Sequence, residues 1–153
     1  MFITDVTQSL QKNKVKYALV GGYAVALHGV VRGTVDVDIV ITTDKKAFKD
    51  AEAALMSLGL QPRLPVTAED VFNYREEYIK NKNLKAWSFS DPANPSHIVD
   101  IVITEDLKDI STVNKKVSGI NVKVASIPDL IAIKKIAGRP QDKEDIKALE
   151  RLL

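Results

Sequence analysis

Two acidic residues stand two positions apart within an apolar run. In the stretch VDVDIVI, residues 35–41, Asp36 and Asp38 alternate with valine and are followed by isoleucine. Side chains of a strand point to opposite faces in turn, so we expect both carboxylates on one face. Two like charges side by side cost free energy unless a cation lies between them. The spacing indicates a cation site, with a strand cap or a solvated sheet edge as the alternative.

A third acidic residue interrupts another apolar strand. Asp100 lies within HIVDIVIT, residues 97–104. A strand pairing that puts Asp100 beside Asp36 and Asp38 would gather three carboxylates. Three carboxylates on rigid strands suit Mg²⁺ or Mn²⁺, which prefer oxygen ligands. Without a metal ion, repulsion would force at least one of the three to hold a proton.

Gly21 and Gly22 precede the start of an expected helix. The unpaired backbone N–H groups of a helix start attract anions, and the missing side chains let a phosphate come close. A metal-binding carboxylate set beside such a phosphate site indicates phosphoryl or nucleotidyl chemistry. A Gly-Gly pair alone is more often a tight turn. Its combination with the three acids favours the active-site interpretation.

Three further side chains are candidates for phosphate binding or support. Arg32 could contact a phosphate as a planar donor fork, or it could be a surface arginine. Thr34 could orient Asp36, although a threonine before a strand is unremarkable. Lys134 falls on the apolar stripe of an expected helix. An inward lysine is costly unless it meets an anion, such as a triphosphate or an aspartate. The alternative is a lysine stem lying along the core edge, with its ammonium group in water.

The elements that position these residues follow from hydrophobic periodicity and turn residues. Together, these patterns predict helices over 3–13, 22–29, 44–58, 68–80, 128–137 and 141–152. They also predict strands over 16–20, 35–42, 84–90 and 97–104, and a hairpin turning at Ser118-Gly119. Asp142 and Asp145 at the start of the last helix are interpreted as capping and helix-dipole residues. The pattern predicts one α/β (α+β) domain over 1–153, with a mixed β-sheet flanked by helices.

The composition excludes several classes of protein function. The chain has 153 residues, a formal net charge of +2 and no cysteine, which excludes disulfides, thiolate catalysis and cysteine-based zinc sites. Two lysine clusters, one at 80–85 and one at 115–123, are interpreted as solvated surface. No signal region and no membrane-spanning run is evident, so we expect a cytoplasmic protein with no membrane partner.

The glycine pair, thirteen intervening residues and the Asp-x-Asp pair together resemble the signature of the nucleotidyltransferase superfamily that includes DNA polymerase β. More narrowly, GGYAVALHG, RGTVDVDI and IPDLIAIKKIAGRPQDKEDIKALERL are similar to small bacterial proteins of the AbiEii-type abortive-infection and minimal nucleotidyltransferase groups. The resemblance covers residues 17–41 and 126–152 and the Asp100 strand. Residues 60–90 match no known pattern.

The resemblance implies a nucleotidyltransferase fold with a C-terminal helical pair. It also implies transfer of a nucleoside monophosphate from an NTP to an acceptor hydroxyl, with release of pyrophosphate. Asp36 and Asp38 would hold two divalent ions, Mg²⁺ or Mn²⁺, that bridge the triphosphate. Asp100 would bind the second ion and help to deprotonate the acceptor. The nucleotide-binding residues that we predict are Gly21, Gly22, Arg32, Thr34 and Lys134.

The sequence leaves the acceptor and the partner open. RNA, a protein side chain and a small molecule are all possible acceptors, and a cognate antitoxin or helical partner in a toxin-antitoxin or phage-defence system is a possible partner. A catalytically silent module that binds a nucleotide or a protein partner is the alternative function. A two-metal phosphodiesterase or nuclease is a third possible function. The phosphate site expected at Gly21 and Gly22 argues against it.

Overall fold

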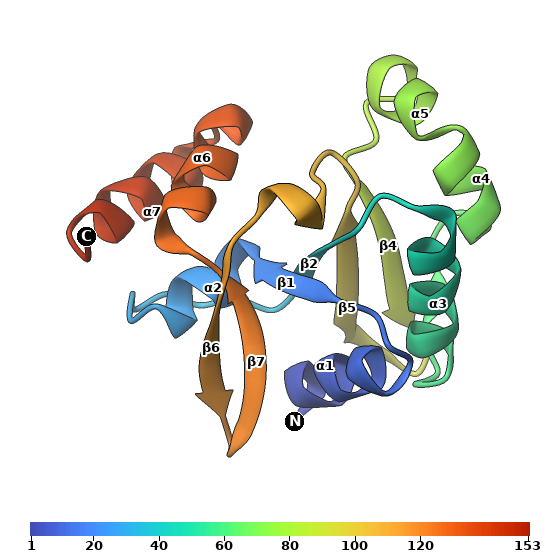
Figure 1. Cartoon of the computed structure of the whole chain (residues 1–153), viewed down its shortest axis with the longest axis horizontal. Coiled ribbons are helices and arrows are strands. Elements are labelled where there is room, and N and C mark those ends of the chain that lie inside the picture. Colours follow the sequence, from blue (N-terminus) through green and yellow to red (C-terminus); the bar gives the residue numbers. More distant parts are fainter.

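The computed structural model describes all residues, 1–153 (Figure 1). The helices are α1 (Phe2–Lys12), α2 (Gly21–Leu27), α3 (Lys45–Met56), α4 (Ala68–Asn73), α5 (Arg75–Asn81), the short 3₁₀ helix η1 (Leu107–Asp109), α6 (Ile127–Ala137) and α7 (Pro140–Glu150). The strands are β1 (Tyr17–Val20), β2 (Val37–Ile41), β3 (Gln61–Pro62), β4 (Ala86–Asp91), β5 (Asn94–Val102), β6 (Thr112–Val117) and β7 (Ile120–Ala125).

All seven strands form one mixed sheet in the order β3-β4-β5-β2-β1-β7-β6. The pairs β2–β5 and β1–β7 are parallel, and the other neighbouring pairs are antiparallel. The predicted hairpin is β6–β7, which turns at Ser118-Gly119. The mixed sheet flanked by helices therefore confirms the predicted fold class.

The two faces of the sheet differ in character. On one face, a row of register partners runs from Leu19 through Ile39 and Ile101 to Trp87, and all four side chains are buried. Helix α3 packs on this face, since the ring of Phe48 lies 6.1 Å from that of Trp87. The next row along the strands points to the opposite face and carries acidic side chains. Because side chains alternate in direction, the apolar row fixes which face the acids occupy.

Besides shifts of one to three residues at the ends of elements, the structure differs from the predicted elements in three ways. Strand β2 begins at Val37 rather than at residue 35, so Asp36 lies in a bend before the strand. The helix expected over 68–80 is two helices, because the backbone leaves helical geometry at Tyr74. Helix α4 buries Ala68, whereas α5 has no buried residue and is tied to the sheet by Arg75, whose Nε donates to the Ile103 carbonyl at 2.6 Å. The two-residue strand β3 was not predicted.

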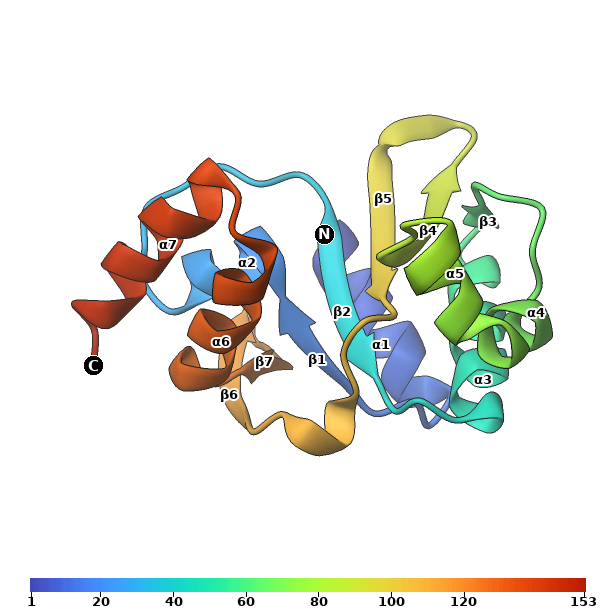
Figure 2. The ribbon, with the colours of Figure 1, turned by 90° about the horizontal axis from the view of Figure 1, so that it is seen from above.

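Helices α6 and α7 form the expected C-terminal pair, which lies at the end of the molecule away from α3, α4 and α5 (Figure 2). Ser126 caps α6, with its hydroxyl accepting from the Asp129 N–H at 3.4 Å. Gly138 ends α6 with a φ of +64°, a conformation that glycine adopts without strain. No helix in the structure combines the length and apolar character needed to cross a bilayer.

Candidate active site

Asp38 and Asp100 are direct register partners on the parallel strands β2 and β5. Neighbouring strands lie about 4.8 Å apart, so the two carboxyl groups stand side by side on the same face. Ser88, the antiparallel partner of Asp100 on β4, donates its hydroxyl to Oδ1 of Asp100. Val20, the last residue of β1, is the partner of Asp38 on the other side. The sheet thus presents an acidic pair next to the end of β1.

The pairing changes the proton affinity of Asp38. Burial raises the pKa of Asp38, and the nearby charge of Asp100 and a side-chain hydrogen bond with it raise it further, to about 7. The charge of Lys134 acts in the opposite direction. Burial and the charge of Asp100 also raise the pKa of Asp36, while Arg63 opposes the shift. Without a cation, the acidic pair therefore retains a proton near neutral pH.

Asp36 does not complete a set of three carboxylates. It lies before the start of β2, where strand alternation no longer sets its direction. No three His, Cys, Asp or Glu side chains come close enough together to form a metal-binding group. The binding of one metal site by all three acids stays a prediction, and the charge of Asp36 contributes to the raised pKa of Asp38. The structure brings Asp38 and Asp100 together as register partners, and Asp36 and Asp38 line one cavity.

Gly21 leaves the space that the Asp38 carboxylate occupies. A Cβ atom at Gly21 would overlap the carboxylate and would lie 2.8 Å from its Cγ. The φ of Gly21 is +66°, which L side chains rarely adopt. Glycine is therefore required here for two independent reasons, namely the space that the Asp38 carboxylate occupies and the positive φ.

Gly22 leaves space for the segment that leads into β2. A Cβ atom at Gly22 would lie 2.6 Å from Oγ1 of Thr34 and 3.3 Å from Cζ of Arg32. Residues 31–36, which have no regular secondary structure, thus pass directly over the start of α2. The glycine pair makes room for protein side chains, and this explains both glycines without a ligand. Their expected contact with phosphates remains a prediction.

Lys134 is buried, as its place on the apolar stripe predicted, with a relative exposure of 5%. Its Nζ lies 2.9 Å from Oδ2 of Asp145 and 3.3 Å from Oδ1 of Asp142, both on α7. Asp145 also accepts from Nη1 of Arg32 and, at 3.0 Å, from Nε2 of Gln141. The anions that satisfy Lys134 are therefore these two carboxylates, which join α6, α7 and the segment before β2.

Asp142 caps α7 as expected and has further partners. Its Oδ2 accepts from the Arg139 backbone N–H at 3.1 Å and from the Arg139 Nε at 2.8 Å. Burial alone would raise the pKa of Asp142, but the hydrogen bonds from Arg139 and the charge of Lys134 outweigh it and lower the pKa. Both Asp142 and Asp145 are almost fully buried, which capping and dipole effects do not require.

The sequence contains a pattern that indicates the burial of Asp142 and Asp145. Asp142, Asp145 and Leu149 recur at helical spacing and form the buried stripe of α7. Acids on the buried stripe of a helix must meet cations or hydrogen-bond donors. Two buried acids on α7 and one inward lysine on α6 are thus the two halves of a single cluster.

Two adjoining cavities share five lining residues, namely Gly21, Asp38, Lys134, Arg139 and Asp142. The first, about 380 Å³, extends over Gly21, Gly22 and the 32–36 segment, and only one of its 12 lining residues is hydrophobic. The second, about 310 Å³, extends over Asp100, Glu105 and Lys85 and along the apolar side chains of α6. The acidic pair thus lies where a polar cavity meets a partly apolar one.

The donor set fits a divalent cation. Mg²⁺ is usually held by one or two carboxylates together with water and substrate phosphates, rather than by a complete protein cage. Asp38 and Asp100 supply those two carboxylates, and the charges of Asp100 and Asp36 add to burial in raising the pKa of Asp38. The polar cavity has four carboxylates, Asp36, Asp38, Asp142 and Asp145, against three cationic side chains, Arg32, Lys134 and Arg139. A cation therefore improves the charge balance of this cleft.

Comparison with known proteins gives structural matches only. No protein-family model and no curated protein matches the chain. Among solved structures, the lincomycin-bound lincosamide antibiotic adenylyltransferase LnuA aligns over 99% of this chain and 96% of its own, with a TM-score of 0.67 and 14% identity. The antibiotic-resistance factor ANT(2'')-Ia aligns over 97% and 80%, with a TM-score of 0.66 and 10% identity.

A third structure widens the range of similar proteins. An antigenic nucleotidyltransferase-like protein from Paracoccidioides brasiliensis aligns over 99% of this chain and 73% of its own, with a TM-score of 0.60 and 18% identity. At these identities the similarity establishes the fold and no more. The alignments extend over almost the whole chain and include residues 60–90, for which the sequence suggested no relative. The protein has the nucleotidyltransferase fold.

Proposed function

We propose that the protein is a metal-dependent nucleotidyltransferase that moves a nucleoside monophosphate from an NTP to an acceptor hydroxyl. The observation that carries the proposal is the Asp38–Asp100 pair above Gly21, at the junction of the two cavities. Within this fold, such a pair beside cationic side chains provides what nucleotidyl transfer needs, namely alignment and charge neutralisation.

The proposed reaction is a displacement at phosphorus. The acceptor oxygen forms a bond to the α-phosphorus, and the bond from that phosphorus to the α–β bridging oxygen breaks. The electron pair of the broken bond leaves with pyrophosphate. Asp100, held by Ser88, takes the proton of the acceptor hydroxyl. A divalent ion bound by Asp38 and Asp100 would neutralise the charge of the triphosphate.

The polar cavity is the proposed nucleotide side. Arg32, Lys134 and Arg139 lie there with donors for phosphate oxygens, and Gly21 and Gly22 open the start of α2. Asp36 on the wall of this cavity is the proposed additional metal ligand. Because the cavity has more carboxylates than cations, we expect a triphosphate to enter together with the divalent ion and not alone.

The other cavity is the proposed acceptor side. Its wall combines apolar residues of α6 with Lys85 and Glu105. A toxin-antitoxin or phage-defence role with an RNA or protein acceptor is the proposed context, because the glycine-pair and Asp-x-Asp motifs resemble those of AbiEii-type and minimal nucleotidyltransferases. A small hydroxylated acceptor is the other possibility, because two of the similar structures are antibiotic-modifying or antibiotic-resistance proteins.

One observation favours the catalytically silent alternative. Each of the three cationic side chains in the polar cavity is already bonded to a carboxylate of α7. A triphosphate must compete with these internal partners. If it cannot, the fold would serve as a module that binds a nucleotide weakly or binds a protein partner.

A labelling experiment separates the two functions. The protein is incubated with Mg²⁺ and each α-labelled NTP, alone and with total cellular RNA or cell extract. Transfer of label with pyrophosphate release, lost in both Asp38→Asn and Asp100→Asn and retained in Asp50→Asn on α3, supports the enzyme. Calorimetry that detects no NTP binding with Mg²⁺ or Mn²⁺ would reject it.

A further inference from the structure

A cavity larger than either cavity of the candidate active site lies away from the acidic pair. It has a volume of about 620 Å³ and shares no lining residue with either cavity of the candidate active site. Tyr17, at the start of β1, lines it, whereas Asp38 is paired with Val20 at the end of the same strand. Tyr17 and Val20 are three positions apart along the strand, a span of roughly 10 Å. We call this cavity the hairpin groove.

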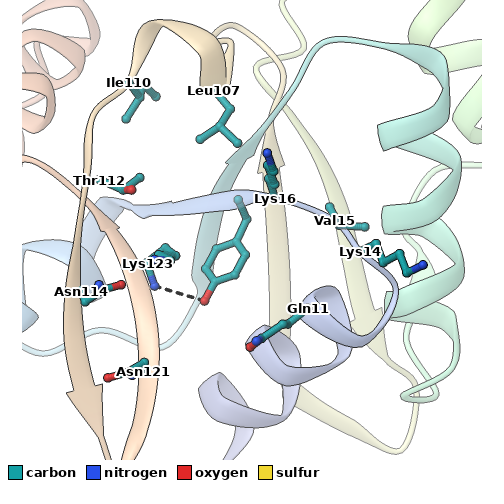
Figure 3. Close-up of a pocket in the computed structure, with 11 residues that line it drawn as sticks. Gln11, Lys14, Val15, Lys16, Leu107, Ile110, Thr112, Asn114, Asn121 and Lys123 are labelled. Atoms are coloured by element: carbon teal, nitrogen blue, oxygen red, sulfur yellow. Dashed lines mark hydrogen bonds between the residues drawn. The ribbon is translucent and has the colours of Figure 1, made fainter.

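The groove exists because the sheet opens between β1 and β7. Only one register pair, Leu19 with Val124, joins these strands. Beyond it the β6–β7 hairpin diverges from β1, as Figure 1 shows. The gap is bridged by a single polar contact, in which the Lys123 backbone N–H donates to the Tyr17 hydroxyl at 3.2 Å. The groove is thus a wedge with the hairpin on one side and the end of α1 on the other (Figure 3).

The lining of the groove suits an anion. Lys14 and Lys16 come from the segment between α1 and β1, and Lys123 comes from β7 (Figure 3). Polar uncharged side chains, Gln11, Asn114 and Asn121 among them, supply further hydrogen-bond donors. No aspartate or glutamate lines the groove. An entering anion would therefore meet only attractive charge.

The positive charge extends beyond the groove on both sides. Residues 11–17 and 112–125 contain six lysines and no acidic residue; the three that lie outside the groove lining are Lys12, Lys115 and Lys116. None of the six forms an ion pair with a carboxylate of the chain. All but Lys115 are exposed. A compact anion could reach only some of these lysines, whereas an extended polyanion could reach most of them.

From this geometry we infer that the hairpin groove and its flanking lysines bind the phosphodiester backbone of a nucleic-acid strand. Lysine neutralises phosphates without reading sequence, so binding should be insensitive to base sequence and strongly dependent on salt. The inference does not depend on the proposed transfer reaction. If both hold, the groove is a docking surface for a nucleic-acid acceptor, separate from the acidic pair.

The test measures binding without catalysis. Anisotropy of a labelled single-stranded RNA is followed in EDTA, without NTP, over a series of salt concentrations. The variant Lys14→Gln/Lys16→Gln/Lys123→Gln is compared with Lys46→Gln/Lys80→Gln/Lys82→Gln, which removes the same charge from α3 and the α5 region. We expect the groove variant to lose at least about tenfold in affinity and about 2 in the slope of log K against log salt, at roughly 0.7 per phosphate contact. The control should stay within about twofold of the native protein.

A second measurement uses the native chain alone. RNA should protect Lys14, Lys16 and Lys123 from acetylation, as read by mass spectrometry, and leave Lys46 and Lys80 reactive. Equal losses of affinity in the two triple variants, no RNA binding at low salt, or no selective protection would each overturn the inference. Inorganic tripolyphosphate that competes as well per phosphate as the RNA would also overturn it, since the groove would then be a site for small anions.

Discussion

Asp38 and Asp100 face each other across the parallel strands β2 and β5, and the carboxylate of Asp38 fills the space that Gly21 leaves open. The pair combines burial with like charge, which raises the pKa of Asp38 to about 7. Both the rigidity of the sheet and the glycine at the end of β1 hold it in this arrangement.

Metal-free Asp38→Asn protein should be more stable than the native chain at pH 8. The pKa of Asp38 is raised from 3.8 to about 7 on folding. The folded native chain therefore loses stability as the pH rises from about 4 to 7, and asparagine removes this loss. Urea unfolding in EDTA should show a gain of about 1–3 kcal/mol at pH 8 and almost none at pH 4. Asp36→Asn should give a smaller gain of the same sign. A less stable Asp38→Asn protein at pH 8 would contradict the assignment.

Divalent metal binding should strengthen as the pH rises through 7. The ion must displace the proton that Asp38 retains near neutral pH, so Mn²⁺ affinity at pH 6 should be about tenfold weaker than at pH 8. Titration calorimetry at the two pH values measures the difference. Asp100→Asn should abolish binding, and Asp50→Asn on α3 should leave it unchanged. Equal affinity at both pH values would show that Asp38 is not a ligand.

Gly21→Ala should destabilise the protein by about 1–3 kcal/mol, because the new Cβ atom meets Asp38 and the backbone is held at positive φ. Gly33→Ala is the matched control, since a Cβ atom there meets nothing within 4 Å, and its effect should be within about 0.5 kcal/mol. The double variant Gly21→Ala/Asp38→Ala should recover part of the loss, as measured by urea unfolding. No recovery would mean that backbone strain alone explains the glycine.

Lys134 and Asp145 should be strongly coupled. Removing one partner of a buried ion pair leaves a buried charge, so Lys134→Met and Asp145→Asn should each cost about 3–5 kcal/mol. Because each single variant already breaks the pair, the double variant should cost less than their sum, with a coupling energy of about 1–3 kcal/mol. The exposed pair Lys46–Asp50 on α3 is the control, with an expected coupling of about 0.5 kcal/mol. Urea unfolding of the four proteins of each cycle measures both values, and additive effects at Lys134 and Asp145 would contradict the cluster.

Local patterns were sufficient for much of this structure. Strand alternation predicted the face that Asp38 shares with its neighbours, and helical spacing predicted that Lys134 is buried and needs an anion. The glycine pair, the capping residues and the hairpin turn marked where elements begin and end. These features depend on a few consecutive residues, so the chain encodes them directly. The helix break at Tyr74 and the short strand β3 were missed, because packing against distant elements overrides weak local signals there.

Contacts between distant segments required the tertiary structure. The partner of Asp38 depends on the order of strands in the sheet, which places β5 beside β2. The anion that satisfies Lys134 depends on how α6 packs on α7, which selected Asp142 and Asp145. The hairpin groove arises only because β7 leaves β1 after one register pair. Pairing between separated segments depends on the packing of the whole chain, so no local pattern specifies it.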